Sequence, residues 1–168
     1  MSIENLLATV HFGATSAPQR SATWIAARIP NRPLSPGPTK EVWPAAGSVA
    51  RLKVEGALAA ADDRSVFLVT ETDAKIGAAI DALTFDLYLR LLRGVTRAGY
   101  PHLLRVWNYV PHIHDASSGV DRYMSFCKGR SEAFAAHYGD AFPDQLPAAS
   151  AVGCPGDTLV VHLLASRE

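Results

Sequence analysis

Cysteine is scarce in this chain, and the scarcity excludes several classes of protein. The 168 residues contain only Cys127 and Cys154, too few for a disulfide scaffold or a four-cysteine zinc site. No apolar run reaches the ~20 residues that a membrane helix needs. The first residues, MSIENLLATVHF, have neither the basic start nor the small-residue cleavage site of a signal peptide. We therefore expect a soluble protein of the reducing cytoplasm, with no membrane partner.

An excess of charge of one sign is also absent. Sixteen basic residues balance sixteen acidic ones, and the isoelectric point is about 7.0. Because domains that bind nucleic acids broadly are normally basic, this balance argues against a nucleic-acid partner, while it leaves room for a local anion pocket. Hydrophobic residues make up 48% of the chain, which excludes global disorder and suits one domain spanning residues 1–168.

Short strand patterns fill the first seventy residues. The expected strands are residues 6–12, 22–29, 49–54, 57–61 and 65–70. Glu55-Gly56 suits a hairpin turn, and the run VFLV is typical of a strand buried on both faces. Four prolines between Pro30 and Pro38 fit neither a helix nor a central strand, so we expect a surface loop there. Residues 1–42 as a whole carry the weakest pattern.

The apolar spacing becomes helical after residue 73. Gaps of four, three, four and four separate Ile76, Ile80, Leu83, Leu87 and Leu91. This stripe predicts a helix over residues 73–99, which Thr72 or Asp73 could cap and Gly99 could end. The pattern continues with a strand over 102–109, a helix over 120–138, and closing strands over 148–153 and 158–164.

This order of elements predicts an α+β fold, with one mixed sheet and two long helices packed on one of its faces. The strands are apolar on both sides, so the opposite face must be covered as well. We expect it to meet another subunit or another domain rather than water.

Metal binding and nucleophilic catalysis have little support. Three histidines lie close in the sequence: His102, His112 and His114. No third firm ligand accompanies the last two, so we expect solvated loop histidines and no metal site. Cys127 has no histidine three or four residues away and is expected to be a buried free thiol, and His162 is expected to be a satisfied core residue. Phosphate-loop and serine-hydrolase motifs are absent.

Tyr123 and Arg130 form the most informative pair of polar residues. Their spacing of seven is two helical turns, so both side chains point the same way. Arginine offers a planar fork to a carboxylate, and tyrosine offers a directed hydroxyl, so the pair could form part of a carboxylate-binding wall. The residues alone also allow a structural alternative, in which Tyr123 is packed and Arg130 pairs with Glu132 or Asp121.

The segment around this pair resembles the signature of the chorismatase family. The resemblance rests on RVWNY at 105–109, then on Arg122-Tyr123-x-x-Phe126-Cys127-x-Gly129-Arg130, and on LPAASAVG at 146–153. It extends over about residues 43–168 and is densest over 101–130. Members of this family include chorismate hydrolases and 3-hydroxybenzoate synthases, and some are labelled pteridine-dependent deoxygenase-like proteins.

The resemblance implies a tandem of two domains of the Rid (YjgF) type, with chorismate bound between them. Our chain resembles the N-terminal domain, in which Tyr123 and Arg130 match the substrate-binding tyrosine and arginine. The catalytic glutamate of the family belongs to the C-terminal domain, so no catalytic residue is expected in this chain and the chain alone should be inactive. The parent enzyme would release pyruvate from chorismate, together with a dihydroxycyclohexadiene carboxylate or a hydroxybenzoate, without a metal or an organic cofactor.

Two alternatives stay open. The chain could be a free-standing Rid-like binding or assembly module, which would associate as a homo-oligomer, for example a trimer, through its open sheet face. It could also be an enamine/imine deaminase, which uses an arginine in a Pro-x-Arg-x-x-Val segment. Ala149 stands at that arginine's place in the run from Pro147 to Val152, and an alanine cannot bind a substrate carboxylate.

Overall fold

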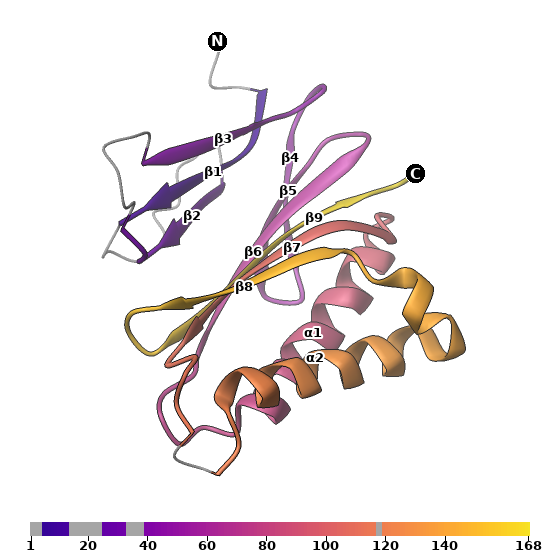
Figure 1. The fold of residues 1–168 in the computed structure, drawn as a ribbon. Helices are drawn as coiled ribbons and strands as arrows, with labels where there is room; N and C mark the ends of the chain where they lie inside the picture. Colours follow the sequence, from indigo (N-terminus) through magenta and orange to yellow (C-terminus); the bar gives the residue numbers. More distant parts are fainter. Residues whose placement is uncertain (1–4, 14–24, 33–38, 117–118) are drawn as a thin grey trace.

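Three layers make up the part of the chain that the computed structural model describes, residues 5–13, 25–32, 39–116 and 119–168 (Figure 1). A six-stranded sheet lies in the middle, with two long helices on one face and a three-stranded sheet on the other. The predicted α+β class and the packing of both long helices on one face are confirmed. The N-terminal strands form a sheet of their own, whereas the sequence pattern predicted a single mixed sheet.

The six-stranded sheet has the order β4-β5-β6-β9-β7-β8. Its strands are β4 (Ala50–Val54), β5 (Ala57–Ala61), β6 (Ser65–Asp73), β7 (His102–Pro111), β8 (Ala148–Cys154) and β9 (Thr158–Ser166). The predicted hairpin joins β4 and β5, and its two turn residues Glu55 and Gly56 both have positive φ, as a tight two-residue turn requires. The predicted closing strands are not neighbours: β9 lies between β6 and β7, and β8 runs parallel to β7 at the end of the order.

The two long helices are α1 (Ile80–Arg97) and α2 (Arg122–Tyr138), and a 3-10 helix, η2 (Gly139–Gln145), follows α2. The predicted start of the first helix is wrong, because β6 continues to Asp73 and Ile76 is 59% exposed in the connection. Ala79 precedes the first helical turn instead of Thr72 or Asp73, while the helix ends just before Gly99 as predicted. No helix within the described ranges is both long and apolar enough to cross a membrane.

The N-terminal sheet has the order β2-β1-β3, with β1 (Leu6–Phe12), β2 (Ile25–Ile29) and β3 (Lys40–Pro44). Residues 22–24 of the predicted second strand and 33–38 of the predicted proline-rich loop lie outside the described residues. β3 has no counterpart among the predicted strands. Val10, Ile29 and Trp43 of this sheet share one hydrophobic core with Phe67 and Val160 of the large sheet. The chain's own N-terminal strands therefore cover sheet surface that was predicted to meet another subunit or domain.

Aromatic rings fill this second core. His162, in the middle of β9, is 1% exposed, and its ring centroid lies 4.7 Å from that of Trp107 and 5.4 Å from that of Phe67. Burial lowers the pKa of His162 to about 3, so the ring is neutral at neutral pH. The predicted core position is confirmed, although its Nδ1 atom has no hydrogen-bond partner among the described residues.

Candidate functional site

Helix α2 carries both predicted binding residues, and its family-like motif has one buried and one accessible side. The buried residues are Arg122, Phe126, Gly129, Ala133 and Phe134. Asp121 caps the helix, since its carboxylate accepts hydrogen bonds from the backbone N–H groups of Tyr123 and Met124. Asp121 thus has a structural role at the start of the helix. It is not the surface partner of Arg130 that the structural alternative in the sequence analysis proposed.

Arg122 fixes the start of α2 relative to the sheet. Its guanidinium donates hydrogen bonds to the carbonyl groups of Pro111 and Lys75, each at 3.1 Å, and to that of Ala74. Pro111 ends β7, and Ala74 directly follows β6. One buried arginine therefore connects the helix to two strand ends, so the motif residue next to Tyr123 is structural.

Gly129 brings the two helices into close contact. A Cβ atom at this position would lie 2.0 Å from the backbone oxygen of Asp81 in α1, so any larger residue would force the helices apart. Beside it, Lys128 Nζ lies 3.2 Å from Asp81 Oδ2 at the surface. Only glycine permits this approach, which holds α2 close against α1.

Tyr123, Cys127 and Arg130 lie along the accessible side of α2. Residue Tyr123 is 44% exposed, and its hydroxyl interacts with the Cys127 thiol. This interaction raises the pKa of Tyr123, while the positive charge of Arg130 opposes the increase. The seven-residue spacing thus places the tyrosine and the arginine within electrostatic range of each other. Cys127 is free but partly exposed, so the prediction of a buried thiol is wrong.

Arg130 lines a pocket of about 90 Å³ between the helices and the edge of the sheet. The other lining residues are Tyr88, Val106, Phe134, Leu146, Pro147 and Ala149. Among the described residues that line it, Arg130 alone carries a charge, and none is an aspartate or a glutamate. Tyr123 is not part of the lining. An arginine in an apolar pocket of this size suits a small anionic group such as a carboxylate.

Tyr88 and Asn108, which the sequence analysis did not single out, form a buried polar pair behind Arg130. The Tyr88 hydroxyl donates a hydrogen bond to Asn108 Oδ1, and Asn108 Nδ2 donates to the Ser150 carbonyl of β8 at 2.8 Å. Burial raises the pKa of Tyr88 well above its usual value, against the opposing charge of Arg130. The sequence did contain a signal for this pair. Tyr88 lies within the apolar stripe of α1, and a buried phenol needs a hydrogen-bond partner.

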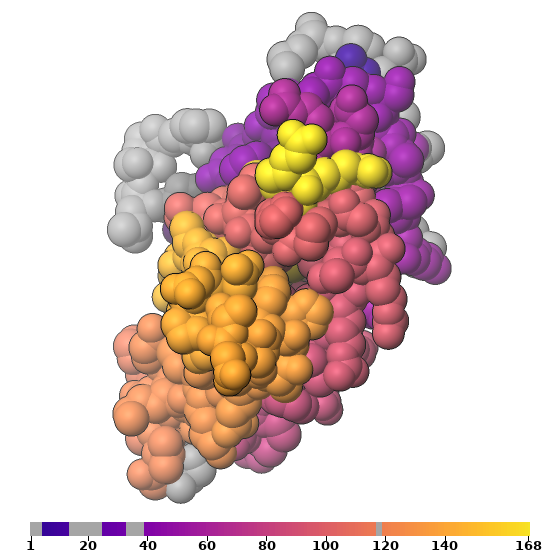
Figure 2. Space-filling view, turned by 90° about the vertical axis from the view of Figure 1, so that its right-hand side faces the viewer, coloured from indigo at the N-terminus to yellow at the C-terminus, as the bar shows by residue number. Residues whose placement is uncertain are grey.

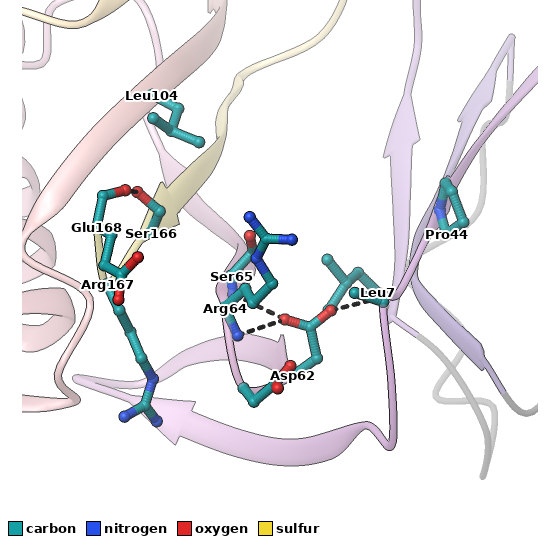
Figure 3. Close-up of a pocket in the computed structure, with 11 residues that line it drawn as sticks. Leu7, Pro44, Asp62, Arg64, Ser65, Leu104, Ser166, Arg167 and Glu168 are labelled. Carbon is teal, nitrogen blue, oxygen red and sulfur yellow. Dashed lines mark hydrogen bonds between the residues drawn. The ribbon is translucent and has the colours of Figure 1, made fainter.

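A larger pocket of about 590 Å³ lies between the two sheets and the C-terminal end of the chain (Figure 3). Figure 2 shows the last residues (yellow) at the surface beside N-terminal segments (purple). Asp62 has its carboxylate bonded by the backbone N–H groups of Ala46, Arg64 and Ser65. Burial raises the pKa of this carboxyl, but these bonds outweigh burial and hold it below its usual value. Asp62 therefore orders the turn between β5 and β6 rather than acting as an acid.

The histidines singled out in the sequence do not come together. His112 Nε2 lies 2.7 Å from Asp157 Oδ1, which links the loop after β7 to the turn between β8 and β9. His102 and His114 are exposed on β7 and on the following loop. Within the described parts of the chain, no three His, Cys, Asp or Glu side chains are grouped as a metal ion would require.

The fold and the pocket together define an α+β domain that presents one arginine between a helix and the edge of a sheet. Comparison with known proteins identifies the family of this domain. Residues 41–165 match the family model described as chorismatase FkbO/Hyg5-like, N-terminal. A chorismatase from Streptomyces hygroscopicus is 34% identical over 128 residues, which are 76% of this chain and 36% of that protein. The chain therefore belongs to the FkbO/Hyg5-like chorismatase family, which confirms the resemblance seen in its motifs.

Two further relatives agree with this assignment. A 3-hydroxybenzoate synthase from the same organism is 34% identical over 82 residues, or 48% of this chain and 24% of that protein. The crystal structure of a chorismatase has a TM-score of 0.82 and 26% sequence identity, and the match covers 98% of this chain and 49% of that chain. Our chain thus spans about a third of the first curated relative and about half of the solved one.

Proposed function

We propose that this chain is the substrate-clamping, N-terminal Rid-like part of a cytoplasmic chorismatase, in which Arg130 and Tyr123 bind chorismate. The observation that carries the proposal is the position of Arg130, which lines a small pocket whose other lining residues are uncharged. Chorismate carries two carboxylates, and a guanidinium in an apolar pocket binds a carboxylate more strongly than one in bulk water. Tyr123 extends the clamp along the same side of α2.

The proposed reaction of the complete protein cleaves the enolpyruvyl ether of chorismate. A general acid protonates the methylene carbon of the enol ether, which gives an oxocarbenium ion. When water is consumed, it adds to the oxocarbenium carbon, and the resulting hemiketal breaks down to pyruvate and a dihydroxycyclohexadiene carboxylate. Without net water, the bond between the ring carbon and the ether oxygen breaks, pyruvate leaves, and the ring loses a proton to become a hydroxybenzoate. Because no described residue lining the pocket is a carboxylic acid, we assign the acid to a second Rid-like domain and expect this chain alone not to turn chorismate over.

Exposed apolar residues on α2 and at the start of β8 support the attachment of such a second domain there. Leu146, which lines the pocket just before β8, is 51% exposed, and Met124 of α2 is 64% exposed. β8 is also the last strand in the order of the large sheet, so one of its edges faces away from β7. A partner that covered this side would bury these residues and would close the Arg130 pocket.

Binding and turnover test the proposal separately. Calorimetry of the 168-residue chain with chorismate should detect binding that Arg130→Ala weakens by about 10- to 100-fold, the range expected for a lost charged hydrogen bond. Tyr123→Phe should weaken it by less. Lys128→Ala is the matched control, because Lys128 is an exposed cation of the same helix that pairs with Asp81.

A pyruvate-release assay then tests the expected inactivity. No turnover should occur with this chain alone. Robust turnover by the pure chain would contradict the assignment of the general acid to a second domain, and equal chorismate affinity in Arg130→Ala and the unmodified chain would contradict the clamp.

The second candidate is a free-standing binding or assembly module. The same exposed residues, on α2 and just before β8, favour it, because apolar surface without a partner domain is commonly buried by self-association. Size-exclusion chromatography with light scattering should then show an oligomer, for example a trimer. A monomer at every concentration would rule out this candidate.

The imine deaminase alternative gains no support from the pocket. Ala149 lines it at the place where that enzyme class uses an arginine, and its methyl group cannot bind a carboxylate. Although Arg130 reaches the same pocket from α2, an imine-hydrolysis assay should detect no activity.

A further inference from the structure

Tyr88 and Asn108 are polar residues buried in an otherwise apolar part of the core. They are 2% and 1% exposed and come from α1 and β7. Burial of a phenol and an amide is unfavourable unless their polar atoms are hydrogen-bonded, so every bond of this pair matters for the fold. Because the pair lies directly behind Arg130, it can also influence how the arginine side chain is oriented.

The directions of the hydrogen bonds follow from the donors and acceptors present. The Ser150 carbonyl can only accept, so the Asn108 amide must turn its NH₂ group toward it and its oxygen toward Tyr88. The single hydroxyl hydrogen of Tyr88 is then donated to Asn108 Oδ1. With its hydrogen engaged, the Tyr88 oxygen is left as an acceptor.

Arg130 matches this remaining acceptor. Tyr88 and Arg130 line the same small pocket, the positive charge of Arg130 lowers the pKa of the Tyr88 hydroxyl against the effect of burial, and a guanidinium can only donate hydrogen bonds. Of its five N–H donors, those not engaged by Tyr88 stay available on the pocket side, where the neighbouring side chains, such as Val106, Phe134 and Ala149, are apolar. Ring contacts of Tyr88 with Phe126 and Phe134 hold the phenol in place.

We propose that Tyr88 and Asn108 are positioning residues for Arg130: the chain Ser150 carbonyl, Asn108 amide, Tyr88 hydroxyl fixes the guanidinium so that its remaining donors face a bound carboxylate. This inference rests on the proposed function only for the identity of the ligand. Asn108 acts without touching Arg130, and it links the orientation of the arginine to the backbone of strand β8.

Hydrogen exchange of the Arg130 guanidinium, followed by NMR on the 168-residue chain, tests the proposal without any ligand. Tyr88→Phe keeps the ring and removes the acceptor, so exchange of the guanidinium N–H groups should become about tenfold faster, as expected for one lost hydrogen bond. Asn108→Ala should change the rate in the same direction. Tyr138→Phe is the control, because it removes a hydroxyl from a half-buried tyrosine of α2 that stacks on Phe134.

Each result bears on one residue. An unchanged exchange rate in Tyr88→Phe would overturn positioning by Tyr88, and an unchanged rate in Asn108→Ala would overturn the role of Asn108. Chorismate affinity measured on the same variants separates this proposal from the proposed function. If the unmodified chain fails to bind chorismate while Tyr88→Phe still alters exchange at Arg130, positioning stands and the proposed function falls.

Discussion

The two faces of the six-stranded sheet are built differently, and neighbouring residues of β7 show how. Trp107 and Tyr109 point toward the N-terminal sheet, into an aromatic core around His162. Asn108, between them, points toward the helices and bonds Tyr88. One face is thus closed by the chain's own strands, while the other leads through a polar pair to an accessible arginine. The closed face contributes stability, and the helix face presents the arginine.

This difference also bears on where the proposed second domain would attach. The sequence predicted that the sheet face opposite the helices would meet another subunit or domain, but the N-terminal sheet packs there. Exposed apolar side chains are found instead on the helix side, where Met124 of α2 and Leu146, just before β8, are examples. Substitutions on the face covered by the N-terminal sheet should therefore mainly lower stability, whereas substitutions on the helix face should also weaken chorismate binding.

The largest expected effect is on the closed face. Phe67 is fully buried and packs against Trp43 and His162, so Phe67→Ala should lower the free energy of unfolding by about 3–5 kcal/mol in denaturant titrations. The protein that stays folded should keep its affinity for chorismate. Val42→Ala, at an exposed position of β3, is the control and should change stability by no more than about 0.5 kcal/mol. A Phe67→Ala loss below 1 kcal/mol would mean that the N-terminal sheet does not seal this face.

A smaller effect is expected between the helices. Gly129→Ala places a methyl group against the Asp81 carbonyl, so α2 must shift, and we expect a loss of about 1–3 kcal/mol together with weaker chorismate binding. Ser131→Ala, on the exposed side of the same helix, should have little effect on either quantity. Normal affinity and stability in Gly129→Ala would show that the close helix contact does not position the clamp.

The effect that is smallest at neutral pH comes from His162, and it grows as the pH falls. The pKa of His162 falls from an ordinary 6.5 to about 3 on folding, so the unfolded chain binds more protons between these values. Stability should fall as the pH drops from 6.5 toward 3, with this one group contributing at most about 1.4 kcal/mol per pH unit. His162→Phe should remove that part of the slope. His11 and His137, whose pKa values burial also lowers, will leave a residual slope. A slope unchanged by the substitution would contradict the neutral buried ring.

Elements with their own periodicity were predictable from the sequence. The stripe of α1, the two-residue turn after β4 and the seven-residue spacing on α2 are local patterns that follow from backbone geometry. The start of α1 was not, because Ile76 continues the helical spacing although it lies in an exposed connection. β3 was missed because Lys40–Pro44 begins with two charged residues, ends in a proline and follows closely on the prolines before it.

Long-range contacts were beyond the sequence pattern. Strand order depends on which distant segments pair, and nothing local indicates that β9 inserts between β6 and β7. The same holds for the site. Arg130 was predicted from its helix, whereas Tyr88 and Asn108 join it only because α1 and β7 are brought together by the fold.

Chemical-shift mapping of the 168-residue chain with chorismate tests the central claim most directly. The account predicts that the shifts concentrate on Arg130, Tyr123 and the Ala149 region of β8, and that the N-terminal sheet does not respond. Shifts confined to the N-terminal sheet or to the pocket at the C-terminal end, or the absence of any shift at Arg130 at saturating chorismate, would contradict it.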